Sequence, residues 1–199
     1  SNLSRSQRTN LMRSSVLPML PGGARLHIAA PGWGGKLGTG GKVWPGAVAM
    51  CQLLLSLGNS NRLAGSSILE LGCGAGAVGV FGAALGASRV VMTDGGESEC
   101  ALAELNARRH KYLYQPGSSV SSCQYLWGEP VDELLADGSF DWVLGADIIY
   151  SDAALPPLCD VFSALIERSP PGTPRIVLAH QRNRAGEGAL PRTLALVAA

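Results

Sequence analysis

The chain has 199 residues, of which 46% are hydrophobic and 16% are charged, and its formal net charge is +1. This balance is typical of a single globular, somewhat apolar domain that is long enough to bury a sizeable core. No run of about 18 apolar residues occurs, so no membrane-spanning helix is predicted.

Charge is unevenly distributed along the chain. No Asp or Glu precedes Glu70, although that stretch contains several Arg and Lys residues, and the remainder is net acidic. Residues 1–25 are basic and rich in Ser, which fits an arm for an acidic partner, a transit-like leader or a solvated terminus. We therefore divide the sequence into this irregular segment and one domain over residues 26–199. The lack of a basic stripe argues against a nucleic-acid substrate.

The five cysteines form neither a C-x-x-C pair nor a Cys/His cluster of zinc spacing, so no metal site is predicted. Isolated thiols fit a reducing compartment. We expect a cytoplasmic protein, with the nucleus or an organelle as the alternatives.

Strands and helices alternate after a glycine-rich loop over residues 31–46. Periodicity and boundary residues predict helices over 46–57, 77–85, 97–111 and 155–166, and strands over 68–71, 89–93, 120–126, 140–146 and 175–179. Another helix is predicted to begin within 190–199. In the 97–111 helix, Ala101, Leu102 and Leu105 are expected to face inward. The alternation predicts an α/β fold, a Rossmann-like, doubly wound and mostly parallel sheet with helices on both faces.

Four candidate site residues fall at or just beyond the ends of successive predicted strands: Glu70, Asp94, Trp127 and Asp147. In parallel sheets, ligands bind beyond the carboxyl ends of the strands. We therefore expect these side chains to converge on one crevice.

The loop after the first strand, Gly72-Cys73-Gly74-Ala75-Gly76, predicts a tight turn where the backbone approaches a ligand. The spacing also matches the dinucleotide fingerprint, and a turn needed only for packing is a further alternative. Glu70 precedes the loop, where a carboxylate would repel a pyrophosphate but favour the cationic end of S-adenosylmethionine. This charge favours a methyl donor.

Three further residues have both a binding and a structural interpretation. Asp94 is suited to accept hydrogen bonds from both ribose hydroxyls, or to cap the following helix. Trp127 could cover a purine or belong to the core. Trp44 is either a lid over the cofactor or an anchor for the helix that follows it.

The fourth strand ends in Asp147-Ile148-Ile149-Tyr150, where an acid and a phenol could hold a cationic amine. The structural alternative is a helix cap and a buried tyrosine. Isolated His27, His110 and His180 are interpreted as structural or surface residues.

These motifs together resemble the class I, seven-strand S-adenosylmethionine-dependent protein lysine methyltransferases. The chain is most similar to the methyltransferase-like group acting on valosin-containing protein (an AAA ATPase), Hsp70 chaperones, elongation factors and calmodulin. The resemblance covers residues 26–184 and rests on five pieces in the family's order: residues 39–45, 69–76, 93–94, 126–128 and 145–150.

The resemblance implies a lysine-bearing protein substrate and S-adenosyl-L-methionine as cofactor. It places Trp44, Gly72 to Gly76, Asp94, Trp127 and Ala146 at the cofactor, and Asp147 and Tyr150, as a D-x-x-Y motif, at the target lysine. With Glu70 from the charge argument, the predicted cofactor residues are Trp44, Glu70, Gly72, Cys73, Gly74, Gly76, Asp94, Trp127 and Ala146, and the predicted catalytic residues are Asp147 and Tyr150. No residues for the family's last two strands follow in this chain, which predicts an exposed apolar edge on strand five.

Two alternatives to lysine methylation stay open at this point. One is a methyltransferase for a small amine or nucleic acid, and the other is a catalytically inactive cofactor-binding interaction module. For the leading interpretation, we hypothesise that Asp147 captures the ammonium of the lysine and that a proton leaves to water before transfer.

Overall fold

The computed structural model describes residues 17–31 and 39–181. A five-stranded sheet of parallel strands in the order β3-β2-β1-β4-β5 forms its centre. The strands are β1 Ser67–Leu71, β2 Arg89–Asp94, β3 Ser119–Gln124, β4 Trp142–Ala146 and β5 Arg175–Ala179. Leu71 of β1 pairs with Thr93 of β2 and with Gly145 of β4, so the carboxyl ends of these strands meet at one edge. The predicted α/β fold is confirmed.

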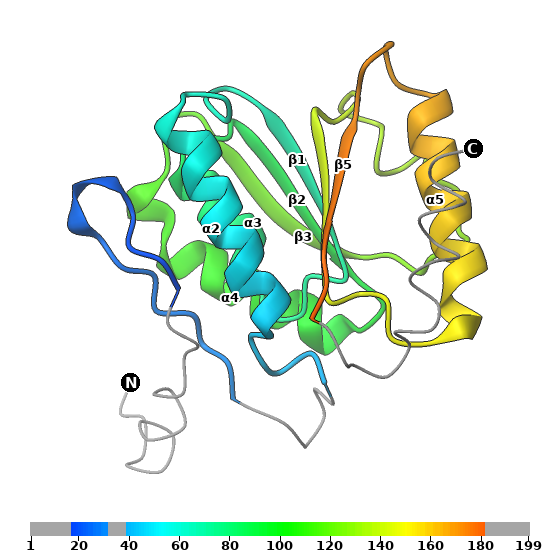
Figure 1. Ribbon diagram of the computed structural model, residues 1–199, viewed down its shortest axis with the longest axis horizontal. Helices are drawn as coiled ribbons and strands as arrows, with labels where there is room; N and C mark the ends of the chain where they lie inside the picture. Colours follow the sequence, from blue (N-terminus) through cyan, green and yellow to red (C-terminus); the bar gives the residue numbers. More distant parts are fainter. Residues whose placement is uncertain (1–16, 32–38, 182–199) are drawn as a thin grey trace.

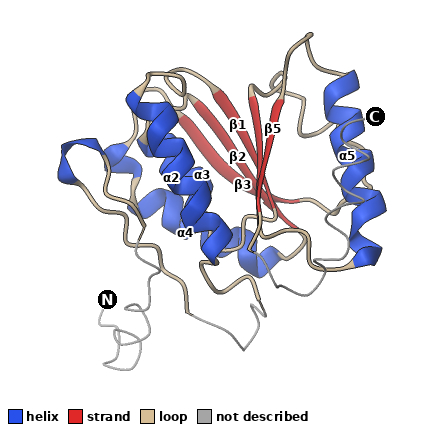
Figure 2. Cartoon of the chain, in the orientation of Figure 1, coloured by secondary structure: helices blue, strands red, loops and turns tan. Residues whose placement is uncertain are grey.

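Helices cover both faces of this sheet. Helices α2 Pro45–Asn59, α3 Ala77–Ala84 and α4 Glu97–Arg109 lie on one face, and α5 Leu155–Glu167 lies on the other (Figures 1 and 2). Short 3-10 turns are η1 Pro21–Gly23, η3 Lys111–Leu113 and η4 Asp152–Ala154. The chain moves outward from β1 to β3 and then returns to place β4 beside β1. Such a reversal of strand order is where open α/β sheets bind ligands.

Strand β1 contributes to two separate cores because alternate side chains of a strand point to opposite faces. Ile68 packs in the core beneath α2, α3 and α4, whereas Leu69 and Leu71 pack in the core beneath α5. The three side chains are fully buried. The strand is therefore held rigidly just before the glycine loop.

The described N-terminal residues pack against the domain. Leu17 and Leu20 are each 5% exposed and belong to the same core as Leu26 and Ile28. Part of the segment assigned to residues 1–25 thus contributes apolar surface to the core. The boundary at residue 26 stays a prediction.

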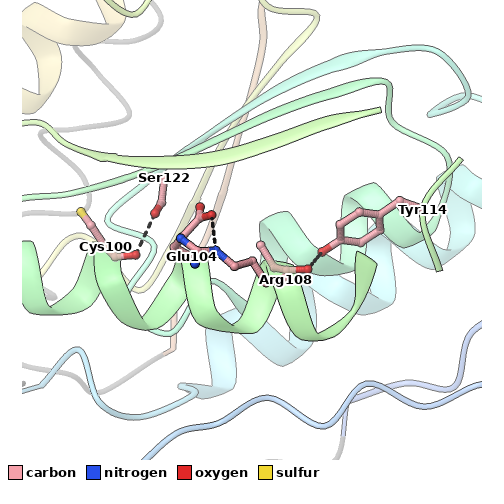
Figure 3. Close-up of polar contacts among 6 residues, drawn as sticks. Cys100, Glu104, Arg108, Tyr114 and Ser122 are labelled. Atoms are coloured by element: carbon pink, nitrogen blue, oxygen red, sulfur yellow. Dashed lines mark hydrogen bonds and ion pairs between the residues drawn. The ribbon is translucent and has the colours of Figure 1, made fainter. Parts of the chain in front are cut away.

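The inward face of α4 differs from the prediction. Ala101 and Leu105 are exposed, and Leu102 is half-buried, whereas Cys100, Ala103, Asn106 and Ala107 face inward. Small side chains let this helix lie close to the sheet, where Ser122 of β3 donates its hydroxyl to the carbonyl of Cys100 (Figure 3). Choosing the large apolar residues as the buried face was wrong because close packing favoured the small ones.

Most other predicted elements agree with the structure, with shifted ends. Strand β3 ends at Gln124 rather than residue 126, and α4 ends at Arg109, where η3 follows. The helix predicted within 190–199 lies outside the described residues. Within residues 17–31 and 39–181, no helix is both long and apolar enough to cross a membrane.

Candidate functional site

A cavity of about 600 Å³ lies at the carboxyl ends of β1, β2 and β4, a volume suited to a small ligand. Its walls come from the glycine loop, the segment before α2, the loop after β3 and the residues following β4. Ten of the predicted site residues line it: Trp44, Glu70, Gly72, Cys73, Gly74, Asp94, Trp127, Ala146, Asp147 and Tyr150. The structure therefore brings together side chains that the sequence separates widely.

Glycine is required in the loop by both its backbone angles and its neighbours. Gly72 and Gly74 have φ values of +63° and +50°, which side chains other than glycine rarely adopt. A Cβ at Gly74 would lie 3.0 Å from the carbonyl oxygen of Gly40. The segment that precedes α2 thus lies directly against the loop and closes one side of the cavity.

Asp94 connects the glycine loop to the start of α4. Its Oδ2 accepts the N–H of Gly74 at 2.8 Å, and its Oδ1 accepts the N–H of Gly96 at 3.2 Å. A carboxylate has about four lone-pair positions, so both oxygens keep capacity for a ligand hydroxyl. The residue preceding α4 at the N-cap position is Gly96, and the Asp94 carboxylate lies nearby as a partly buried acceptor.

Gly76, the eleventh predicted residue, does not line the cavity. It precedes α3 at the N-cap position with a φ of +72°, and a Cβ there would lie 2.8 Å from the Cβ of Ala103 in α4. The glycine therefore serves the close approach of α3 and α4. Ala75 and Ala77 line the cavity on either side of it.

Glu70 is buried within the cavity wall, with 2% of its surface exposed. Burial raises the pKa of its carboxyl group to about 8; the N–H of Gly79, which donates to Oε2 at 2.8 Å, opposes this rise, and the negative charge of Asp94 adds to it. A buried acid of this kind would be stabilised by a cation in the cavity. A positively charged ligand would therefore lower this pKa, whereas a pyrophosphate would keep the acid protonated.

Trp44 combines the two roles that the sequence left open. It lines the cavity and also precedes α2 at the N-cap position, and its indole N–H donates to the carbonyl of Thr39 at 3.0 Å. The Nζ of Lys42 lies 4.4 Å from the centre of the Trp44 ring. The ring thereby fixes the segment that covers the glycine loop.

Trp127 and Tyr150 form an aromatic pair in the cavity wall. Their ring centres are 6.4 Å apart with an interplanar angle of 44°. The indole of Trp127 reaches the glycine loop, since its Cζ2 lies 3.6 Å from the Cβ position of Gly72. Tyr150 is 52% exposed, so the alternative of a buried tyrosine is wrong and the phenol stands at the mouth of the cavity.

Asp147 ties together three segments that are far apart in sequence. Its Oδ2 accepts the N–H of Gly46 in the first turn of α2 at 2.8 Å, and its Oδ1 accepts the N–H of Gln181 after β5 at 2.7 Å. Its own N–H donates to the carbonyl of Ala179 at 2.7 Å, and its side chain is 1% exposed. Asp147 thus caps α2 from a distant strand. The predicted capture of a cationic amine by this group stays a prediction.

Several lining residues were not identified from the sequence. Thr39, Gly40 and Lys42 belong to a piece already quoted for the family resemblance, and that signal could have placed them beside Trp44. Leu126 and Ile148 likewise belong to quoted pieces, whereas the lining residues Glu99 and Tyr125 carried no such signal. Within the part of the chain that the structure describes, no group of three or more His, Cys, Asp or Glu side chains is placed to hold a metal ion.

Known proteins are similar to this chain in sequence and in fold. The chain is 37% identical over 131 residues to protein N-lysine methyltransferase METTL21A of Danio rerio, covering 65% of this chain and 57% of that protein. It is 34% identical over 157 residues to EEF1A lysine methyltransferase 3 of Mus musculus, covering 79% and 62%. The chain thus spans about three-fifths of the length of these relatives.

The fold resembles a Bacillus cereus O-methyltransferase solved in complex with SAH, with a TM-score of 0.54 and 20% identity over 79% of this chain and 70% of that one. A family model described as lysine methyltransferase matches residues 26–190. That match covers most of the chain and includes every predicted site residue. The chain therefore belongs to the lysine methyltransferase family.

Proposed function

We propose that this chain carries the catalytic core of an S-adenosylmethionine-dependent protein lysine N-methyltransferase. The observation that carries the proposal is one cavity in which the glycine loop, the Asp94 carboxylate and the Trp127–Tyr150 pair meet. Family membership supports the reaction type. The family resemblance and the charge of the cavity together favour a methyl donor over a dinucleotide.

The residues of the cavity fit the parts of S-adenosylmethionine. Asp94 has free acceptor capacity for ribose hydroxyls, and Trp127 offers an aromatic face for the base. Gly72 and Gly74 let the backbone approach the amino-acid end closely. Glu70 supplies a buried acid whose charge a sulfonium would stabilise. When bound, the cofactor supplies a methyl group activated by the positive charge on sulfur.

The protein's task toward the lysine is to present a neutral amine in line with the methyl group. A free lysine has a pKa near 10.4, so deprotonation at about pH 7.4 costs about 4 kcal/mol. Trp127 and Tyr150 form an aromatic wall that removes water from the amine, which lowers the lysine pKa. A proton is then released to water, and alignment by the cavity supplies much of the rate.

The substrate in this proposal is a lysine-bearing protein. The names of the relatives support this class, and one of them names the elongation factor EEF1A. Chaperones, AAA ATPases and calmodulin-like proteins are the other substrates that the family resemblance suggests. Five free cysteines, three of them buried, support the proposal of a reducing compartment such as the cytoplasm.

Two measurements test the proposal. Calorimetry tests whether the purified chain binds S-adenosylhomocysteine, the product formed from the cofactor. The absence of binding at millimolar concentration refutes the proposal. Radiolabelled methyl donor with cell lysate then asks what becomes labelled. Labelling of a protein, mapped to lysine, supports it. Labelled nucleic acid or small amine, or binding without any transfer, would instead establish one of the two alternatives.

A further inference from the structure

Asn106 in α4 joins two segments that lie far from it in sequence. Its Oδ1 accepts the N–H of Ala29 at 2.8 Å, and its Nδ2 donates to the carbonyl of Ala29 at 3.0 Å. The same Nδ2 donates to the carbonyl of Ala75 at 2.8 Å. The side chain is fully buried. One amide therefore links the segment 24–31, here called the N-terminal strap, to the glycine loop.

This pattern of contacts requires a carboxamide. Ala29 presents one donor and one acceptor, and Ala75 presents a second acceptor, so the central group must accept one hydrogen bond and donate two. Asparagine satisfies all three, whereas an ionised aspartate offers only acceptors and a leucine of similar size offers none. At a site without access to water, each group left unpaired carries a desolvation cost.

His110, which follows α4 at its C-cap position, holds the strap one turn further along. The N–H of His27 donates to Nε2 of His110 at 3.1 Å, while Nδ1 of His110 lies 2.8 Å from the carbonyl of Asn106. Since a carbonyl can only accept, the ring is neutral with its proton on Nδ1, and burial lowers the pKa of His110 in keeping with this. Leu26 and Ile28 point into the core between these contacts. The strap is thus fixed along its length.

The contact with Ala75 is the one that reaches the cavity. Ala75 lines it, and the neighbouring Gly74 is held from the other side by Asp94. Glycine-rich backbone is inherently free to move, so contacts on both sides are what keep the loop in a single conformation. None of the strap residues lines the cavity. The hydrogen bonds of Asn106 connect the strap to the cavity wall at Ala75.

We propose that Asn106 is a positioning residue of the cofactor site, and that through it the N-terminal strap is part of the cofactor-binding machinery. This inference rests on the proposed function, because it takes the cavity to bind S-adenosylmethionine. Ligand binding and ordering of the strap are then coupled. Cofactor binding stabilises the strap, and a loosened strap lowers the affinity for the cofactor.

Hydrogen exchange on the unaltered chain provides the first test. With S-adenosylhomocysteine present, we expect slower exchange in the peptides covering 69–79 and also in those covering 24–31. A ligand that protects the glycine loop and leaves residues 24–31 unchanged overturns the proposal. If the unaltered chain does not bind the ligand at all, the proposed function fails, and that result is distinct from failure of this inference.

Variants provide the second test. Asn106→Asp keeps the acceptor for Ala29 and removes both donors, and Asn106→Leu removes all three contacts. We expect each to bind S-adenosylhomocysteine about tenfold more weakly, a change the size of one buried hydrogen bond. Ser67→Ala is the control, because it removes the hydroxyl contact with Asp141 at the opposite end of the sheet.

The comparison separates positioning from general stability. Calorimetry is run well below the unfolding midpoint, after circular dichroism shows each variant folded. We expect the control to keep its affinity within about twofold even where its midpoint falls. If Asn106→Leu does not fold, Asn106→Asp and the exchange measurement still decide. Unchanged affinity in a folded Asn106 variant, or an equal loss in the control, refutes the proposal.

Discussion

Replacing Asp147 by asparagine tests the two roles that this residue has been given. As a receptor for a cationic amine, the carboxylate would matter for substrate and not for folding. In the structure its two oxygens accept the N–H groups of Gly46 and Gln181 at 2.8 and 2.7 Å. Asparagine has one carbonyl oxygen and one NH₂ group, so one of these two N–H groups must lose its acceptor. The structure therefore predicts a loss of stability.

The size of that loss follows from the groups involved. A hydrogen bond to a charged group contributes about 1.5 to 3 kcal/mol, and an N–H left buried without a partner costs a similar amount. The negative charge beside the start of α2 adds about 0.3 to 1 kcal/mol through the helix dipole. Because the Asp147 side chain is 1% exposed, solvent offers little compensation. We expect a total of about 2 to 4 kcal/mol, or a midpoint lower by roughly 5 to 15 °C for a domain of this size.

Urea unfolding followed by circular dichroism measures this free energy. Asp152→Asn is the control, since it makes the same chemical change at an exposed site nearby and should shift stability by less than about 0.5 kcal/mol. Gly46→Ala perturbs the same hydrogen bond at its donor, because the added Cβ would lie 2.7 Å from Cγ of Asp147. Unfolding of Asp147→Asn at the urea concentration of the unaltered chain would refute the capping role and favour amine capture.

Three further outcomes are expected. The pKa of Glu70 is raised from 4.5 to about 8, so its ionisation increasingly favours the unfolded chain as pH rises through that window. The stability gained by Glu70→Gln should therefore grow between about pH 5 and 8.5, to at most roughly 5 kcal/mol. Parallel pH profiles of the variant and the unaltered chain in urea unfolding would contradict this. Gly74→Ala should weaken S-adenosylhomocysteine binding about tenfold in calorimetry. The control is Gly117→Ala, where φ is +84° and the space is open, so the change should cost only about 1 to 2 kcal/mol of folding stability through backbone strain. Equal affinities of the two variants would show that the contact between position 74 and Gly40 is unimportant. Tyr150→Ala should impair methyl transfer to a protein substrate while changing S-adenosylhomocysteine affinity by less than about twofold, because Tyr150 is 52% exposed at the mouth of the cavity. An equal loss of methyl transfer and of S-adenosylhomocysteine affinity would place Tyr150 at the cofactor.

The succession of strands and helices along the chain could be predicted from the sequence because each signal is local. Apolar runs bounded by glycine marked β1 and β2, and the glutamates and arginines of α4 marked its two ends. Glycine at positions 72 and 74 predicted a tight turn, and in the structure both residues have φ values in the left-handed region. A parallel sheet then necessarily brings the tips of β1, β2 and β4 to one edge, so the location of the cavity followed as well.

Other features depend on which distant segments pack together, and no local pattern contains that information. Leu105 looked like a core residue, but α4 approaches the sheet through smaller side chains and leaves it 48% exposed. Gly76 belonged to the binding loop by its spacing, yet Ala103 of a later helix is what requires it to be glycine.

The sequence by itself determined the fold class and the edge of the sheet where the site lies, because periodicity and turn chemistry act over a few residues. Only the tertiary structure decided what Asp147 and Asn106 hold. Their partners lie 101 and 34 residues away for Asp147, and 77 and 31 residues away for Asn106. Hydrogen bonds over such separations exist only once the sheet and its helices have assembled around them.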